Sequence, residues 1–343
     1  MPAHDAFLDK LRYYRDLSTQ ALISSIPNRE PKKYLYDLIP EYPTRGGKGF
    51  RPSLCISTCR IFGGTELEAI RSSVALELFH NAFLVHDDVE DESEARRGLP
   101  TLNAAYGNGI AVNVGDAMNV ISLRPLMENV FTLGPRVAWD VFGEVEHMVL
   151  ESVEGQAMEL GWRRDNVVDL TDDDYLRMVL KKTCWYTCMH PIRIGALLGS
   201  KSKVDVSSFD RFGFYLGAAF QIQDDLLNLI GDKDKYGKEI CGDVLEGKRT
   251  LMLIHLLNHT KGKTKKHLVE YLSRARSERS LEEMRWILKL MMKTGSLEHG
   301  IKSAKNLAGA ALKEFFTAFG MKPDNEHRQF LENMILYMIS RDY

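Results

Sequence analysis

Two apolar stretches with helical spacing, each ending in clustered polar side chains, constrain this chain most strongly. Each stretch carries an acidic or amide side chain at the first, second and fifth positions of the same short pattern. These side chains are Asp87, Asp88 and Asp91 in the first stretch and Asp224, Asp225 and Asn228 in the second. Residues four apart lie on one side of a helix, and carboxylates at that spacing repel unless a cation is bound. Hard oxygen ligands in this arrangement suit Mg²⁺, which usually shares its shell with water and substrate phosphates.

The apolar residues before each acidic motif indicate the kind of substrate. Charged groups embedded in apolar helices are unfavourable unless they are paired or bind metal. Two such helices facing one another would form a cavity with cations at its mouth and an apolar interior. We therefore expect a substrate with a diphosphate head and an apolar tail. A solvated acidic helix end would explain either motif alone, but it leaves the repeated spacing unexplained.

Basic residues near the first motif predict anion binding. Arg96 and Arg97 follow the motif, and a glycine-rich loop, 45–52, carries Lys48 and Arg51 at the start of an expected helix. Glycines let backbone N–H groups approach an anion, and the positive end of a helix favours one. The planar guanidinium adds paired donors that suit phosphate. An ordinary basic loop with a capping proline explains 45–52 equally well when the loop is considered by itself.

The bulk composition argues against several classes of protein. The 343 residues are 44% hydrophobic and 27% charged, enough for a large buried core, and the formal net charge of -2 provides no nucleic-acid footprint. No apolar run approaches the roughly 20 residues of a membrane-spanning helix. The first residues lack the layout of a signal peptide, so we expect a cytoplasmic protein. The five cysteines are expected to be reduced, buried thiols, and the lysine-rich run 261–266 to be solvated.

Hydrophobic periodicity predicts helices along most of the chain. We expect one helix over 5–25, a pair within 53–86 and a pair within 116–162. A short helix near 34–39 is expected to stop at Pro40 and Pro43. A further helix is expected to begin after an N-cap at Thr171, with three aspartates in its first turn.

The remaining patterns predict one all-α domain. No proline lies between Ile192 and Met321, which fits a series of uninterrupted helices. Sustained alternation typical of strands is absent. The chain has no Gly/Ser-rich linker and no low-complexity segment, so residues 1–343 are expected to fold as a single domain.

Taken together, these motifs and loops resemble trans-type polyprenyl diphosphate synthases, the family that includes farnesyl and geranylgeranyl diphosphate synthases. The resemblance covers nearly the whole chain. It implies a single-domain orthogonal helical bundle of the isoprenoid synthase type with a central apolar cavity, and a homodimer. It also implies three magnesium ions with substrate bound, and two substrates: isopentenyl diphosphate and an allylic prenyl diphosphate such as dimethylallyl, geranyl or farnesyl diphosphate.

The resemblance assigns roles residue by residue. The residues expected to bind isopentenyl diphosphate are Lys48, Arg51, His80 and Arg97. The residues expected at the allylic diphosphate are Arg96, Lys182, Thr183, Gln221, Lys238 and Lys248. Magnesium is expected on Asp87, Asp91 and Asp224, with support from Asp88, Asp225 and Asn228. The residues expected to take part in catalysis are Asp87, Asp88, Asp91, Lys182, Asp224 and Asp225.

The implied reaction is head-to-tail prenyl transfer. Bound cations and basic side chains would stabilise the departing diphosphate, and the double bond of isopentenyl diphosphate would attack the resulting allylic cation. Phe83 and Phe79 lie four and eight residues before Asp87, so they would point down the apolar cavity from one helix face. With the small Ala82 beside them, they favour geranylgeranyl diphosphate over farnesyl diphosphate as the product.

Three alternatives stay open. A class I terpene cyclase would share the scaffold but needs no second diphosphate site, and Asn228 in place of an aspartate points toward it. A non-catalytic synthase subunit would be expected to lose acidic ligands. A helical scaffold protein with solvated acids leaves the matched spacing unexplained. Among other polar residues, Asp116 is expected to point inward, and Glu159 either reaches the cavity or makes ordinary polar contacts.

Overall fold

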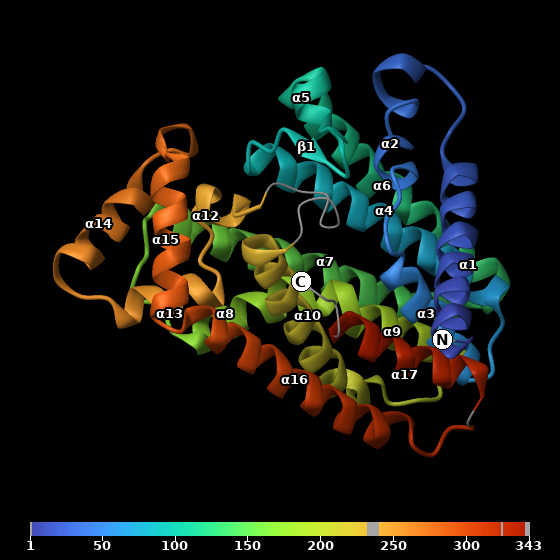
Figure 1. Cartoon of the computed structure of the whole chain (residues 1–343). Coiled ribbons are helices and arrows are strands. Elements are labelled where there is room, and N and C mark those ends of the chain that lie inside the picture. The colour runs from blue at the N-terminus through green and yellow to red at the C-terminus, as the bar shows by residue number, and fades with distance from the viewer. Residues whose placement is uncertain (1, 232–239, 324, 340–343) are drawn as a thin grey trace. The chain divides into compact units, whose positions relative to one another are not determined.

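The computed structural model describes residues 2–231, 240–323 and 325–339, and nearly all of their secondary structure is helical (Figure 1). The first elements in chain order are α1 (Pro2–Ser25), the π-helical turn η1 (Lys32–Tyr36), α2 (Glu41–Thr44), α3 (Phe50–Ile61), α4 (Glu66–Glu90), β1 (Ala95–Arg96), β2 (Leu99–Pro100), α5 (Leu102–Tyr106), α6 (Asn108–Leu133) and α7 (Pro135–Arg164). They are followed by α8 (Asp172–Val179), the π-helical segment η2 (Leu180–Met189), α9 (His190–Ser200), the 3₁₀ turn η3 (Val206–Phe209), α10 (Asp210–Ile230), α12 (Gly242–Glu246), α13 (Leu251–His259), α14 (Gly262–Ser273), the 3₁₀ turn η4 (Arg276–Glu278), α15 (Leu281–Lys293), α16 (Ser296–Phe319) and α17 (Glu326–Ile339).

The chain divides into two compact units. The first unit comprises Met1–Met148, Tyr186–Arg211 and Phe315–Met334, and the second comprises Val149–Trp185, Phe212–Glu314 and Ile335–Tyr343. The first acidic motif and the basic loop belong to the first unit, and the second acidic motif belongs to the second. The expected single domain, and the expected facing of the two acidic helices, stay predictions.

In the first unit, α4 packs along α6 and against α3 (Figure 1). A capping box fixes the start of α4: the Thr65 hydroxyl accepts the Glu68 N–H, and the Glu68 carboxylate accepts the Thr65 N–H. Further along α4, Leu78 and Val85 join Met118 of α6 in one buried cluster. The core therefore holds one side of the helix whose last turn carries Asp87 and Asp88.

The crossing of α3 and α9 is unusually close because two glycines face α3. A Cβ atom built on Gly195 would lie 2.4 Å from the Cys55 carbonyl oxygen, and one built on Gly199 would lie 2.3 Å from the Cys59 carbonyl oxygen. Real side chains do not tolerate contacts this short, so the approach requires residues without a side chain. The position of α3, which begins at the basic loop, is therefore fixed against α9.

In the second unit, α10 carries the second motif and is buried along most of its length. A capping box between Thr171 and Asp174 starts α8, and α13 packs on α8 and α15. At Gly300 of α16, a built Cβ would lie 2.5 Å from Met252 Sδ and 3.2 Å from Leu226 Cδ2. Helices α10, α13 and α16 therefore meet at one tightly packed point.

Most helix predictions are confirmed, including those over 5–25, within 53–86 and within 116–162, and the cap at Thr171. The expected stop at Pro43 is wrong, because Pro43 lies inside α2. Proline is tolerated in the first turn of a helix, where its missing N–H would have no intrahelical acceptor. Within the described residues, strands are limited to the pair β1–β2, and all five cysteines are buried free thiols.

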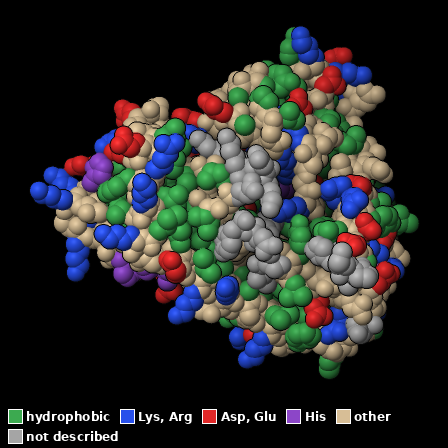
Figure 2. All heavy atoms as spheres, in the orientation of Figure 1, with side chains coloured by type: hydrophobic (Ala, Val, Ile, Leu, Met, Phe, Trp, Pro, Cys, Tyr) green, Lys and Arg blue, Asp and Glu red, His purple; other side chains and the backbone are tan. Residues whose placement is uncertain are grey.

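The surface of the second unit shows the expected solvated lysines. Lys261, Lys263 and Lys266 are exposed at the start of α14, and Figure 2 shows lysine and arginine side chains projecting from the surface at the left edge. In the part of the chain that the structure describes, no helix combines the length and the apolar character needed to cross a membrane.

Candidate active site

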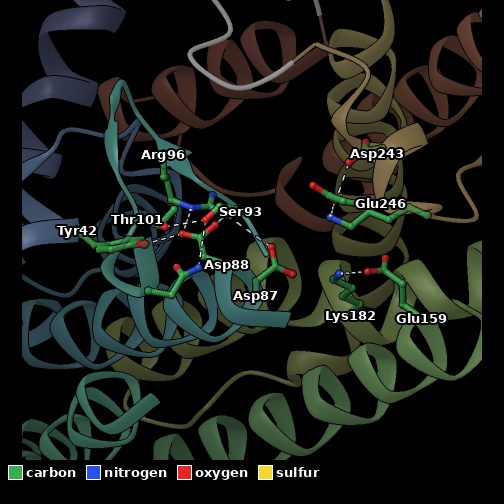
Figure 3. A network of polar contacts seen from close by, with 12 residues as sticks. Tyr42, Asp87, Asp88, Ser93, Arg96, Thr101, Glu159, Lys182, Asp243 and Glu246 are labelled. Carbon is green, nitrogen blue, oxygen red and sulfur yellow. Dashed lines mark hydrogen bonds and ion pairs between the residues drawn. The ribbon is translucent and has the colours of Figure 1, made fainter. Parts of the chain in front are cut away.

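The first acidic motif occupies the last turn of α4. The Asp87 side chain is 25% exposed, whereas Asp88 is fully buried and Asp91, the C-cap residue, is nearly so. Both oxygens of Asp88 accept hydrogen bonds. Arg96 donates from Nε to Oδ2 at 2.7 Å and from Nη2 to Oδ1 at 2.6 Å, and the Tyr42 hydroxyl donates to Oδ2 at 2.6 Å (Figure 3). The same guanidinium lies 3.6 Å from Asp87, so one arginine serves two adjacent carboxylates.

A hairpin directs the two neighbouring arginines to different partners. Ala95 pairs with Pro100 and Arg96 with Leu99, which leaves Arg97 and Gly98 as a two-residue loop. Both loop residues have positive φ, 55° and 76°, as a type I′ turn requires. The reversal of the chain returns Arg96 to the acidic motif and leaves Arg97 free to reach another segment.

That other segment is α2 together with the basic loop that follows it. Arg97 Nη1 donates to the Tyr42 carbonyl at 3.0 Å, and a Cβ on Gly47 would lie 2.9 Å from Arg97 Nη2. The guanidinium therefore packs directly on the loop backbone, where only glycine leaves room. Nearby Glu77 of α4 is an acidic counterpart: burial raises its pKa, whereas Arg51 and Arg97 lower it. Both arginines therefore favour the charged form of this half-buried carboxyl.

Tyr186 of η2 brings three predicted residues together. Its ring lies under the Arg51 guanidinium at 4.1 Å, and Arg51 Nη2 donates to the neighbouring Thr187 hydroxyl at 2.7 Å. The ring of Tyr186 also contacts His80, with centroids 6.0 Å apart, and Phe83, at 5.6 Å. The residues expected to bind isopentenyl diphosphate therefore adjoin a residue expected to limit tail length. Phe79 is buried, and Ala82 belongs to the core cluster shared with α6.

The second acidic motif has a comparable set of bonds within the second unit. The Tyr175 hydroxyl donates to Asp225 Oδ2 at 2.7 Å, and Gln221 Nε2 donates to Oδ1 at 2.7 Å. The Thr183 hydroxyl in turn donates to Gln221 Oε1 at 2.9 Å. Burial raises the pKa of Asp225, and the bonds from Tyr175 and Gln221 act in the opposite direction. Asp224 is half-buried beside this chain of contacts.

The predicted lysines of the second unit lie in ion pairs. Lys182 Nζ is 2.6 Å from Glu159 Oε1 (Figure 3), and Lys248 Nζ is 2.7 Å from Glu246 Oε2. Glu159 is buried and accepts this hydrogen bond from Lys182, and whether it reaches the cavity stays a prediction. Lys238 lies outside the described residues.

The acidic side chains differ in how well they suit a metal. Asp88 and Asp225 have both oxygens engaged by donors, and Asn228 Oδ1 accepts the backbone N–H of Asp243 at 3.1 Å. Asp87 and Asp224 are more accessible carboxylates. The described residues contain no group of three or more His, Cys, Asp or Glu side chains placed to hold a metal ion. Mg²⁺ commonly takes only one or two protein carboxylates and completes its shell with water and phosphate, so these residues fit it.

The comparison with known proteins decides the family. A family model described as Polyprenyl synthetase matches residues 32–291. This chain belongs to the polyprenyl synthetase family. It is 31% identical to a geranylgeranyl diphosphate synthase of Saccharolobus solfataricus, covering 79% of this chain and 80% of that one. It is also 30% identical to the octaprenyl diphosphate synthase of Escherichia coli, covering 87% of each chain.

Solved structures agree with this assignment. The geranylgeranyl pyrophosphate synthetase from Pyrococcus horikoshii superposes with a TM-score of 0.86, at 26% identity over 99% of both chains. The all-α isoprenoid synthase fold expected from the sequence is therefore confirmed. The names of the relatives in the polyprenyl synthetase family span several product lengths, so they support chain elongation without fixing the length.

Several features of this polyprenyl synthetase differ from expectation or went unrecognised in the sequence. Asp116 was expected to point inward, but its side chain is 64% exposed, 3.4 Å from His86. Tyr42, Tyr175 and Tyr186 were not identified as site residues. The sequence does contain one relevant signal, an Arg-Gly pair at 97–98 that is typical of a hairpin turn. Such a turn would predict that Arg96 and Arg97 point to different partners.

Proposed function

We propose that this protein is a magnesium-dependent, chain-elongating prenyltransferase that condenses isopentenyl diphosphate with an allylic diphosphate. The observation that carries the proposal is the division of basic residues in the first unit. Arg96 is bound to the acidic motif, whereas Arg97 and Arg51 gather at the glycine-rich loop. A second group of cations is what a second diphosphate requires, and a terpene cyclase needs only one.

The residues of this chain divide the work of the reaction. Arg51, Arg97, Lys48 and His80 would bind and orient isopentenyl diphosphate. Asp87, Asp91 and Asp224 would hold magnesium, which when bound neutralises the oxygens of the departing diphosphate. Lys182 would add positive charge on the same side of the reaction.

The proposed bond changes require no side-chain nucleophile. The allylic C–O bond breaks, diphosphate leaves with the electron pair, and the double bond of isopentenyl diphosphate forms the new C–C bond. A proton is then lost, and the released diphosphate is a suitable acceptor. Half-buried aromatic groups such as Phe83 and Tyr186 would help to exclude water, which would otherwise quench the cation.

Geranylgeranyl diphosphate is the product that we favour. Phe83 lies one helical turn before Asp87 and its ring contacts Tyr186, so a growing tail would meet aromatic side chains early. Two relatives named geranylgeranyl diphosphate synthase, at 31% and 32% identity, support this product.

A homodimer is the proposed assembly, formed through the outer faces of α6 and the start of α7. These faces expose an unusual number of large apolar side chains: Val112, Val120, Leu123, Met127, Val130, Phe131, Trp139 and Phe142. Phe131 is 88% exposed and Trp139 75% exposed, which is costly for a surface that stays in water. Sedimentation of the wild type and of Phe131→Lys would test this, because a dimer joined here should dissociate in the variant.

One assay separates the proposed reaction from its alternatives. Purified protein is incubated with Mg²⁺, isopentenyl diphosphate and dimethylallyl, geranyl or farnesyl diphosphate in turn, and the products are analysed. Elongated prenyl diphosphates support the proposal. Hydrocarbons formed from the allylic substrate alone would indicate a cyclase, and the absence of any product would indicate a non-catalytic subunit.

A further inference from the structure

The second aspartates of the two acidic motifs have matching environments, each within its own unit. Asp88 and Asp225 are both buried, and each has both oxygens engaged by donors. In each case one donor is the hydroxyl of a fully buried tyrosine far away in the sequence. Tyr42 donates to Asp88 at 2.6 Å, and Tyr175 donates to Asp225 at 2.7 Å.

The remaining donors differ between the motifs, which makes the shared tyrosine more informative. Asp88 also receives the guanidinium of Arg96, whereas the other donor to Asp225 among the described residues is the neutral amide of Gln221. If each buried carboxylate only needed its negative charge neutralised, both would be expected to bind a basic side chain. What they have in common is a hydroxyl that fixes the orientation of the carboxylate.

The direction of the Tyr42 hydrogen bond is determined by its other neighbour. The backbone N–H of Leu102 donates to the Tyr42 hydroxyl oxygen at 3.3 Å, so the single hydroxyl hydrogen is directed to Asp88. Burial raises the pKa of Tyr42 and of Tyr175, so both hydroxyls keep their hydrogen at neutral pH.

We propose that Tyr42 and Tyr175 are positioning residues that hold Asp88 and Asp225 outside the magnesium shell. Successive residues on a helix are rotated by about 100°. Fixing Asp88 therefore fixes the direction of Asp87, and fixing Asp225 fixes that of Asp224. This inference rests on the proposed function, and it changes the expected role of Asp88 and Asp225 from supporting ligands to residues that orient the ligands.

The test measures metal affinity directly. Wild type, Tyr42→Phe and Tyr175→Phe are titrated with Mn²⁺ in the presence of inorganic pyrophosphate, and free Mn²⁺ is followed by electron paramagnetic resonance. Residues that orient metal ligands typically contribute tenfold or more to affinity, so each variant should bind Mn²⁺ about tenfold more weakly. The matched control is Tyr14→Phe, because Tyr14 is also fully buried but its hydroxyl bonds to His327, at 3.1 Å.

Two results would overturn the inference. One is an unchanged Mn²⁺ affinity in Tyr42→Phe and Tyr175→Phe, with thermal stability reduced as in Tyr14→Phe, because the tyrosines would then be structural only. The other comes from Asp88→Asn, which should weaken Mn²⁺ binding clearly less than Asp87→Asn; an equal loss would make Asp88 a ligand. This comparison also applies if a tyrosine variant fails to fold. A wild type that binds no Mn²⁺ with pyrophosphate would instead contradict the proposed function itself.

Discussion

The buried ion pair between Arg96 and Asp88 leads to a quantitative prediction. The Asp88 side chain is 1% exposed and that of Arg96 is 8% exposed, and two hydrogen bonds of 2.6 and 2.7 Å join them. Arg96→Met keeps an unbranched side chain that covers the path of the arginine stem, but it removes both donors. Asp88 would then be a buried carboxylate that keeps the Tyr42 hydroxyl as a donor but has lost its cation, and breaking such a pair costs about 3–5 kcal/mol of unfolding free energy.

The measurement is urea unfolding without metal or substrate, followed by circular dichroism. Arg164→Met is the matched control, since Arg164 is 79% exposed and pairs with Asp165 at 2.8 Å at the end of α7. An exposed pair contributes little to the unfolding free energy, because water screens the two charges. The double variant Asp88→Leu with Arg96→Met should be more stable than Arg96→Met alone, because it removes the uncompensated charge as well.

The outcome also separates two roles for Arg96. If the unfolding free energy of Arg96→Met lies within about 1 kcal/mol of that of the wild type, the pair between Arg96 and Asp88 does not stabilise the fold as a buried ion pair should. Arg96 would then be better described by the role implied by family resemblance, as a ligand of the allylic diphosphate. A loss of stability together with a loss of activity would support a residue that first holds the acidic motif and only through it serves the reaction.

Three further predictions concern packing, pH and product length. Gly199→Ala should lower the unfolding free energy by about 1–3 kcal/mol, because the new Cβ would overlap the Cys59 carbonyl oxygen. Gly309→Ala, on an open face of α16, should instead raise the unfolding free energy by about 0.5–1 kcal/mol. Urea unfolding of both variants measures this difference. Burial lowers the pKa of His190, so below pH 6.5 the unfolded chain binds a proton that the folded protein does not. The free energy of unfolding should therefore fall on acidification from that point by up to about 1.4 kcal/mol per pH unit. His190→Gln should flatten this dependence when unfolding is measured between pH 7.5 and 5.5. Phe83→Ala should lengthen the prenyl products seen by chromatography, since it removes the ring that contacts Tyr186, and an unchanged product length would remove Phe83 from this role.

Local sequence signals predicted the fold well. The cap at Thr171 and the helix pair within 116–162 depend on neighbouring residues, so they can be recognised without knowledge of distant contacts. The acidic motifs and the basic loop were visible for the same reason. Pro43 was misjudged because a proline inside the first turn of a helix looks the same in sequence as one that ends a helix.

The supporting residues could not be predicted because their contacts span long distances in sequence. Tyr42 reaches Asp88 across 46 residues, and Tyr175 reaches Asp225 across 50. A tyrosine in an apolar segment carries no local sign of which carboxylate will receive its hydroxyl hydrogen. The exposure of Asp116 and its contact with His86 likewise depend on the packing of α6 on α4.

The tight reversal at 97–98 has a practical consequence for protein engineering. Arg96 and Arg97 are adjacent in the chain, but the turn directs them to different partners: Arg96 binds Asp88, and Arg97 packs on the glycine-rich loop. Adding a single amino acid to this turn would shift the register and exchange the directions of the neighbouring side chains. A small library of turn lengths would therefore reassign both guanidinium groups at once without changing either arginine.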